Sequence, residues 1–317
     1  HHVLDSKATF QEEVINSLIS GYEEGVTPIP CSRCNRSVKF APMLNWARKH
    51  GKNQRLATGH YARILLGEEP SSGSLTQNNA PKRTQLLRGL DENKDQSYFL
   101  YDLPQEVLSK VIFPLGELTK VDTRKEANLI GLRTAKKPES QDLCLAEHHG
   151  SMKAFLDNYL LPRQGNIVLK NGTVIGEHDG IEHFTIGQRK GLGVSWREPL
   201  HVVQLESESN QVVVATRSEA GLSSCIVGEV NWVSIPPPRK KIYVEVQVRY
   251  RSRPVLAELS PIAATKQDME MQRPYRCQVC FKEEQFSIAP GQAAVFYSGD
   301  IVLGGGIIQS ENQAKTF

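Results

Sequence analysis

The sequence predicts a multidomain protein of the α/β plus β class, with an α/β domain, a small central α+β domain and a C-terminal antiparallel β-barrel. Strand and helix patterns alternate up to about residue 145, which favours an α/β domain with a parallel sheet. From about residue 225 onward, short alternating strands separated by turn residues dominate, as in a small barrel. A chain of 317 residues is long enough for such domains, which we expect to span residues 1–147, 148–222 and 223–312.

The composition is ordinary for a globular protein, with 39% hydrophobic and 23% charged residues. No apolar run approaches the roughly 18 residues of a membrane span, so we expect no membrane partner. The net charge of +3 is too small to identify a nucleic-acid partner by itself. Six cysteines are too few for a disulfide scaffold. We therefore expect an intracellular soluble protein, in a bacterial cytoplasm or in a plastid or mitochondrial interior.

Among the first elements, residues 25–40 (GVTPIPCSRCNRSVKF) hold the strongest candidate site. Two prolines predict an extended lead-in, and a helical pattern follows and ends at Gly51. Cys31 and Cys34 come just before this predicted helix. Backbone N–H groups and the helix dipole stabilise a thiolate at such a place, so both cysteines are candidates for sulfur chemistry or metal binding.

The other helices are predicted from apolar periodicity and from their start and stop residues. A capping-box pattern at residues 9–12 opens a helix that Gly21 follows. Further helices are expected at about 104–111, 122–130 and 152–159. Cys144 follows a basic segment in the sequence ESQDLCL.

The strands follow from alternation and turn residues. Residues 67–84 are expected to form a polar surface insertion, and Asn171-Gly172 predicts a type I′ hairpin turn. Strands are expected at 55–66 with a break at 58–60, and at 86–89, 166–175, 202–203, 212–214, 242–248, 286–288 and 294–297.

Several further motifs have both a functional and a structural interpretation. Gly59 could admit a nucleotide to the end of a strand, or could be an ordinary turn glycine. Lys94, Asp95 and Gln96 suit a solvated loop, and the basic, glycine-rich loop 183–193 could hold phosphate. Arginines at 249–253 beside the segment 290–297 suit RNA binding or a solvated barrel face.

The cysteines also allow a metal interpretation. Cys31, Cys34 and Cys144 offer three ligands, which suits an iron–sulfur cluster such as [4Fe–4S] with one open iron. A structural zinc site needs about four ligands, and His60 is a weak fourth candidate. Cys277 and Cys280 alternate along a predicted strand and would face opposite sides, so we interpret them as structural, together with Cys225.

The whole pattern resembles the tRNA-specific 2-thiouridylases, the MnmA-type enzymes that place sulfur on the wobble uridine. The resemblance covers nearly the whole chain. Its motifs are TPIPCSRCNRSVKF (27–40), ATGHY (57–61), LRGLDENKDQSYFL (87–100), FPLG (113–116), IGEH (175–178), TIGQRKGLG (185–193), VRYR (248–251), PGQAAVFY (290–297) and LGGGII (303–308).

The resemblance implies a partial PP-loop ATPase domain of the Rossmann type, because the family's phosphate-binding Ser-Gly-Gly-Val-Asp-Ser loop lies upstream of residue 1. It implies ATP with Mg as cosubstrate, a sulfur-donor protein, and a tRNA bound by its anticodon stem-loop. Cys34 would be the nucleophile-side cysteine, Cys144 would carry a persulfide, and Gly59 would contact ATP. The tRNA contacts would be Ile29, Pro30, Cys31, His60, Lys94, Asp95, Gln96, Arg249, Tyr250 and Gln292.

The implied reaction is ATP-dependent 2-thiolation of the wobble uridine (position 34), through an adenylylated uracil and the persulfide on Cys144. Arg33, Arg36, Lys136 and Lys137 would favour the thiolates. Many family members carry Asp where this chain has Cys31, which strengthens the cluster alternative here. The rival interpretations are an iron–sulfur-dependent tRNA thiolase, a tRNA-binding fragment inactive without its PP-loop, and another PP-loop enzyme, which the paired cysteines and the barrel disfavour.

Overall fold

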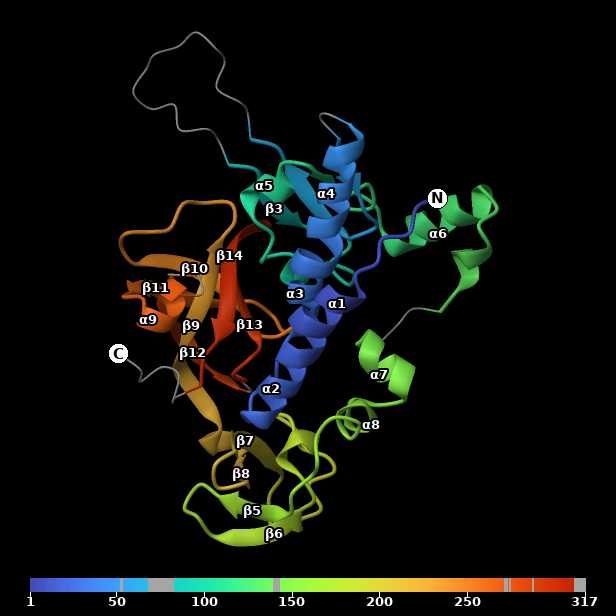
Figure 1. The fold of residues 1–317 in the computed structure, drawn as a ribbon. Helices are drawn as coiled ribbons and strands as arrows, with labels where there is room; N and C mark the ends of the chain where they lie inside the picture. The colour runs from blue at the N-terminus through green and yellow to red at the C-terminus, as the bar shows by residue number, and fades with distance from the viewer. Residues whose placement is uncertain are drawn as a thin grey trace.

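Two helices near the start of the chain lie side by side, as the computed structural model shows (Figure 1). The structure describes residues 1–51, 54–67, 83–138, 143–270, 273, 275–286 and 288–310. The first helix (residues 7–23) consists of α1 (Lys7–Phe10), a π-helical segment η1 (Gln11–Asn16) and α2 (Ser17–Glu23). The second, here called the cysteine helix (residues 30–50), consists of α3 (Pro30–Arg33), the π-helical segment η2 (Cys34–Phe40) and α4 (Ala41–His50).

Both helices begin earlier than predicted. The first starts at Lys7, whose N–H donates to the Asp5 carboxylate at 2.9 Å, so the predicted capping box at residues 9–12 is wrong. Gly21 lies inside this helix, where an added Cβ would come within 2.2 Å of Pro28. Pro30 occupies the first position of the cysteine helix, because its missing N–H needs no partner there. Cys31 and Cys34 therefore lie within the helix and not before it.

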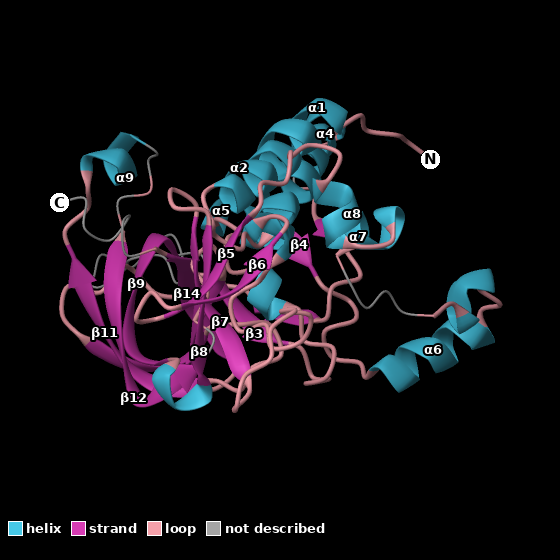
Figure 2. Cartoon of the chain, turned by 90° about the horizontal axis from the view of Figure 1, so that it is seen from below, coloured by secondary structure: helices cyan, strands magenta, loops and turns pink. Residues whose placement is uncertain are grey.

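The C-terminal sheet closes into the predicted antiparallel barrel, because β13 pairs with both β10 and β14. Its strands are β9 (Gly221–Trp232), β10 (Ile242–Gln247), β11 (Val255–Ile262), β12 (Arg276–Phe286), β13 (Ala293–Ser298) and β14 (Ile301–Ile308). Residue 287 of the strand predicted at 286–288 lies outside the described residues. Figure 2 shows the barrel on one side of the molecule and α6 (Lys120–Leu129) projecting on the opposite side.

The parallel sheet expected up to residue 145 is largely absent from the described part of that region. Its single parallel pair there joins β1 (Leu56–Ala57) to β4 (Val111–Ile112). The strands β2 (Ala62–Leu65) and β3 (Gln85–Arg88) form an antiparallel hairpin, and β3 pairs with β14 of the barrel. This hairpin extends the barrel sheet because Leu86 and Leu87 pair with Val302 and Ile301. Most of the predicted insertion at 67–84 lies outside the described residues.

A central four-stranded sheet has the order β6-β5-β8-β7. Its strands are β5 (Gly165–Leu169), β6 (Val174–His178), β7 (Leu200–Glu206) and β8 (Gln211–Thr216). The hairpin predicted at Asn171-Gly172 forms, but its turn is not type I′, since only Gly172 has a positive φ, of 83°. The Asn171 side chain instead accepts from the Thr173 N–H at 3.0 Å, which bends the loop locally.

Short helices connect these parts, and no helix in the described ranges is long and apolar enough to cross a membrane. The α-helices are α5 (Gln105–Leu108), α7 (Cys144–His149), α8 (Met152–Leu156) and α9 (Lys266–Glu270). The 3-10 helices are η3 (Ser97–Phe99), η4 (Arg133–Lys136), η5 (Ile181–His183) and η6 (Arg217–Glu219).

One hydrophobic core joins the cysteine helix to the barrel. It contains Phe40 of the helix, Tyr98 and Tyr101 of the segment between them, and Val295 and Tyr297 of β13, all almost fully buried. Tyr101 packs directly on Gly305 of β14, where an added Cβ would lie 2.7 Å from the ring and 2.9 Å from the Ala294 carbonyl oxygen. A bare backbone at this point lets the aromatic segment lie on the strand.

We predict that Gly305→Ala destabilises the protein by about 1–3 kcal/mol, because a methyl group must displace Tyr101 or the neighbouring strand. Urea unfolding followed by tryptophan fluorescence would measure this loss. Ser298→Ala, at an exposed position of β13, serves as the control and should leave the midpoint unchanged. An unchanged midpoint for Gly305→Ala would show that this contact relaxes without cost.

Candidate active site around the cysteine helix

The cysteine helix presents two half-buried thiols in its first turns. Cys31 lies in α3 and Cys34 begins the π-helical segment η2. In a π-helix, hydrogen bonds join residues five apart, which brings Lys39 towards the face of Cys34. The Lys39 ammonium donates to the Asn35 side-chain oxygen at 3.1 Å, and the Asn35 amide in turn donates to the Phe99 carbonyl oxygen at 3.1 Å. The Lys39 ammonium is thus held where its charge acts on both thiols.

Burial controls the ionisation of these thiols. It raises the pKa of Cys31 to about 11, with smaller contributions from negative charge on Cys144 and Cys34. Burial also raises the pKa of Cys34, while the Lys39 ammonium opposes this shift. Burial therefore acts against the predicted stabilisation of thiolates at this helix start, because desolvation disfavours the charged form of both thiols.

The positive charges that were expected to favour the thiolates are also arranged differently from the prediction. Arg36 donates to the Asp102 carboxylate at 3.1 Å, and Arg33 lies 3.7 Å from the Glu229 carboxylate. Both guanidinium groups are therefore neutralised by carboxylates, and the charge that acts on the thiols comes from Lys39, which we did not predict.

Cys144, at the start of α7, is exposed and lies close enough for its charge to raise the pKa of both Cys31 and Cys34. The fold thus brings together the three cysteines singled out in the sequence. Residues 139–142, which precede α7 in the sequence, lie outside the described residues. Within the described ranges, no group of three or more His, Cys, Asp or Glu side chains is arranged to hold a metal ion. The three-cysteine cluster therefore stays an alternative that the structure does not show.

His60 lies between two aromatic rings near the cysteine helix. Its ring centroid is 5.6 Å from that of Phe40 and 5.8 Å from that of Phe113, and its Nδ1 lies 2.8 Å from the Thr58 hydroxyl. Burial, with a smaller effect of Lys39, lowers the pKa of His60 to about 4. The ring is therefore neutral near pH 7, and its predicted tRNA contact would be that of an uncharged group.

Gly59 lies in the predicted break between β1 and β2. An added Cβ would meet only Leu115, at an ordinary contact distance of 3.5 Å. The packing of the described residues therefore leaves room for a side chain at this position. The predicted approach of ATP to the Gly59 backbone stays a prediction.

The loop of Lys94, Asp95 and Gln96 is more internal than predicted. The buried Asp95 carboxylate accepts from the N–H groups of Gly89 and Ser97, both at 3.0 Å, and from Arg88 at 3.0 Å. Gln96 accepts from the Tyr61 N–H at 3.0 Å. These bonds shape the loop, and its contact with tRNA stays a prediction.

Two of the predicted barrel contacts also organise the protein itself. Gln292, directly before β13, donates to the Thr27 carbonyl oxygen at 2.8 Å and so ties the barrel to the lead-in that precedes Ile29 and Pro30. The Tyr250 ring lies 4.4 Å from that of Phe99. The aromatic Tyr297 is fully buried and lies under the Arg88 guanidinium at 3.5 Å, so it is no stacking platform for a base.

Two further motifs, the loop 183–193 and the pair Cys277 and Cys280, lie in other parts of the structure. In the loop 183–193, His183 is held by Asp157 at 2.8 Å and by Asp179 at 3.1 Å, while Arg189 and Lys190 are exposed. This loop borders a hollow of about 530 Å³ that is formed by residues between Arg189 and Leu200. Cys277 is buried and Cys280 exposed, which confirms that these two residues of β12 face opposite sides.

Comparisons with known proteins identify the family. Models of a tRNA methyl transferase HUP domain, a tRNA methyl transferase PRC-barrel domain and an aminomethyltransferase beta-barrel domain match residues 1–148, 153–216 and 222–308. The chain is 67% identical over 316 residues to the tRNA-specific 2-thiouridylase MnmA of Prochlorococcus marinus (strain MIT 9303). The aligned region is 100% of this chain and 77% of that relative.

The chain belongs to the MnmA family. The MnmA of Parasynechococcus marenigrum (strain WH8102) is 65% identical over 316 residues, again 100% of this chain and 77% of the relative. The resemblance drawn from the sequence motifs is thereby confirmed, as is the combination of an α/β domain, a central domain and a C-terminal barrel.

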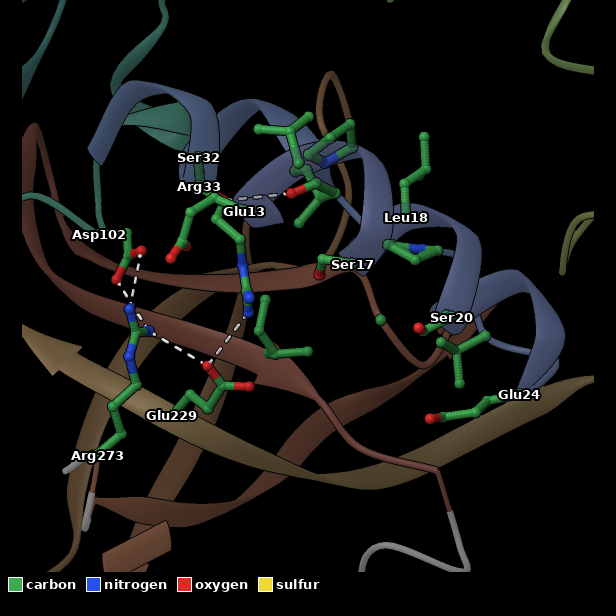
Figure 3. Close-up of a pocket in the computed structure, with 18 of the residues that line it drawn as sticks. Glu13, Ser17, Leu18, Ser20, Glu24, Ser32, Arg33, Asp102, Glu229 and Arg273 are labelled. Atoms are coloured by element: carbon green, nitrogen blue, oxygen red, sulfur yellow. Dashed lines mark hydrogen bonds and ion pairs between the residues drawn. The ribbon is translucent and has the colours of Figure 1, made fainter. Parts of the chain in front are cut away.

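Sequence reasoning missed a set of charged residues that border the site of this MnmA-family chain. Arg33 pairs with Glu229, and Arg273 pairs with both Glu229 and Asp102, beside a cavity of about 220 Å³ between the first helix, the cysteine helix and the barrel (Figure 3). Each lies in a different segment, and the only signal in the sequence was the pair of arginines around Cys34.

We predict that at pH 8 iodoacetamide modifies Cys144 and Cys280 before Cys31. Both of the former are exposed, whereas the raised pKa of Cys31 leaves little of it as the reactive thiolate, which slows its alkylation at least about tenfold. Peptide mass spectrometry over time would resolve each cysteine. Alkylation of Cys31 as fast as that of Cys280 would contradict the buried thiol.

A second prediction concerns stability and pH. The pKa of His60 falls from 6.5 in an unfolded chain to about 4, so the unfolded state binds the proton more tightly. The stability that depends on neutral His60 is complete above pH 6.5 and declines as the pH falls towards 4. Between pH 7.5 and 5, His60→Phe should lose about 1–2 kcal/mol less stability than the parent.

Urea unfolding at both pH values would test this prediction. His50→Phe, which changes an exposed histidine at the end of the cysteine helix, is the control and should behave as the parent. Equal losses in the parent and in His60→Phe would mean that His60 titrates normally.

Proposed function

We propose that this protein is a tRNA-uridine 2-sulfurtransferase, which thiolates C2 of the wobble uridine in an ATP-dependent reaction. Two findings support the proposal: membership of the MnmA family, and a fold in which Cys144 lies near enough for its charge to affect Cys34, although the two are far apart in the sequence. The second finding carries the chemistry, because a persulfide and a resolving thiol must meet.

The C2 oxygen of uracil is a poor leaving group, so ATP would first adenylylate it and release pyrophosphate. A persulfide on Cys144 then attacks C2, and AMP leaves. Cys34 attacks the Cys144 sulfur, which breaks the persulfide bond, forms a Cys34–Cys144 disulfide and leaves the sulfur on C2. A reductant must open the disulfide before the next turnover, and a sulfur-donor protein would rebuild the persulfide.

Substrate binding would use both sides of the cysteine helix. Gly59 lies at the end of a strand of the parallel pair β1–β4, where an open backbone suits the ATP phosphates. The segment from Ile29 to Cys31 would contact a uracil turned out of the anticodon loop, because a stacked base offers no access to C2. The barrel residues Arg249 and Tyr250 would hold the anticodon stem. The intracellular location stays a prediction.

The high pKa of Cys34 places a demand on this mechanism. The thiol must lose its proton before it can attack, and the Lys39 ammonium is the positive charge that favours this loss. Bound tRNA would add negative phosphates beside the site, which disfavour a thiolate, so the Lys39 ammonium becomes more important for the ionisation of Cys34. A cluster-dependent route through Cys31, Cys34 and Cys144 remains the alternative to test, although their present arrangement does not favour it.

We predict that Cys144→Ser abolishes thiolation while tRNA affinity stays within about threefold, because the serine can neither carry nor transfer sulfur. The assay would use the protein with any residues that precede this chain in its gene, purified without oxygen. It would receive ATP, a persulfide donor and an unmodified tRNA, and digestion and mass spectrometry would detect 2-thiouridine.

Cys280→Ser, which removes another exposed cysteine, is the matched control and should retain activity. Product from iron-free parent protein would support the persulfide route. Product only with bound iron would favour the cluster, and tRNA binding without any product would reduce the protein to a binding module.

A further inference from the structure

Five charged side chains join the turn that carries Cys34 to the barrel. Arg36 contacts Asp102 at 3.1 Å and Arg33 contacts Glu229 at 3.7 Å. Arg33 directly precedes Cys34 in the sequence, and Arg36 follows it by two residues. Any shift of the thiol-bearing turn would therefore disturb at least one of the two ion pairs.

Arg273, just before β12, connects the two carboxylates. It contacts both oxygens of Asp102, at 3.2 and 3.3 Å, and the Glu229 carboxylate at 3.3 Å (Figure 3). The bidentate geometry fixes the orientation of Asp102, which is 4% exposed. Arg273 and the two carboxylates are partly or largely shielded from water, so their mutual ion pairs are stronger than ordinary surface pairs, whereas the side chains of Arg33 and Arg36 are 37% and 36% exposed.

The backbone conformation at Glu229 is energetically unfavourable for a residue with a side chain. Glu229 has a φ of 50°, in the left-handed region that non-glycine residues rarely adopt. It lies in β9 where the register with β14 shifts, between Gly228 and Asn231. Bulges of this kind redirect a side chain, and here the redirected carboxylate reaches Arg33 and Arg273.

We propose that Glu229 and Arg273 are positioning residues for Cys34, and that they hold its turn at a defined place relative to the barrel. The proposal rests on the sulfur transfer proposed above. If the barrel holds the anticodon stem, this link sets the distance between the bound tRNA and the attacking sulfur. A small error in that distance slows attack strongly without weakening tRNA binding.

Glu229→Gly tests the proposal, because glycine accepts the positive φ while it removes the carboxylate. The relieved backbone should offset part of the lost ion pairs, so the variant should stay folded at the assay temperature, which its melting curve would check. At saturating tRNA, single-turnover thiolation should slow about tenfold, with the Kd for tRNA within about twofold of the parent. Formation of the Cys34–Cys144 disulfide with oxidised glutathione should slow by a similar factor.

Asp300→Gly is the matched control, because it removes a barrel carboxylate whose partner, Arg63 at 2.6 Å, belongs to β2 and not to the cysteine helix. It should leave both rates unchanged. Unchanged rates in Glu229→Gly would overturn the proposal. If the parent makes no thiouridine, the proposed function fails, and the disulfide rate alone still decides whether Glu229 positions Cys34.

A double mutant separates a shared network from independent effects. If Arg33 and Glu229 act through their ion pair, Arg33→Met combined with Glu229→Gly should slow disulfide formation no more than about twofold beyond the slower single variant. Multiplication of the two effects would show that the residues act separately, and it would also overturn the proposal.

Discussion

The buried segment 97–103 holds the cysteine helix against the barrel, and the arrangement of the site depends on it. Tyr98 and Tyr101 fill the space between the helix and β13, and the Tyr98 hydroxyl donates to the Ala293 carbonyl oxygen at 2.9 Å. Asn231 of β9 donates to the carbonyl oxygens of Tyr101 and Leu103, at 2.8 and 3.1 Å. Since Asp102 lies between these residues, the same packing also presents its carboxylate to the arginines around Cys34.

The thiols illustrate how burial competes with charge. Desolvation raises the pKa of both Cys31 and Cys34, and the Lys39 ammonium only partly opposes this shift. Near neutral pH the two thiols therefore rest in the protonated form. Sulfur chemistry at this site requires a further change that stabilises negative charge on Cys34.

Several residues proposed to contact tRNA also have clear internal roles. Asp95 orders its own loop, Gln292 ties the barrel to the lead-in of the cysteine helix, and Tyr250 packs on Phe99. Phe99 in turn accepts from Asn35, which holds Lys39. A contact between tRNA and Tyr250 would therefore reach the thiol site through two neighbouring residues, and binding and chemistry would share one set of contacts.

The sequence by itself determined the family, the three kinds of domain and the cysteines of the site, because motifs such as TPIPCSRCNRSVKF and alternating strands are local patterns. It also identified the strand break at Gly59 and the opposite faces of Cys277 and Cys280. Only the tertiary structure decided that β2 and β3 extend the barrel sheet, since pairing with β14 depends on segments more than two hundred residues apart.

The charged residues of the site were likewise only partly predictable from the sequence. Arg33 and Arg36 are visible beside Cys34, but their partners Asp102, Glu229 and Arg273 come from distant segments, and no local pattern announces them. The pKa of a thiol depends on how much water surrounds it and on which charges lie near it. Both quantities are properties of the packed structure, which is why the sequence identified the cysteines and only the fold decided their ionisation.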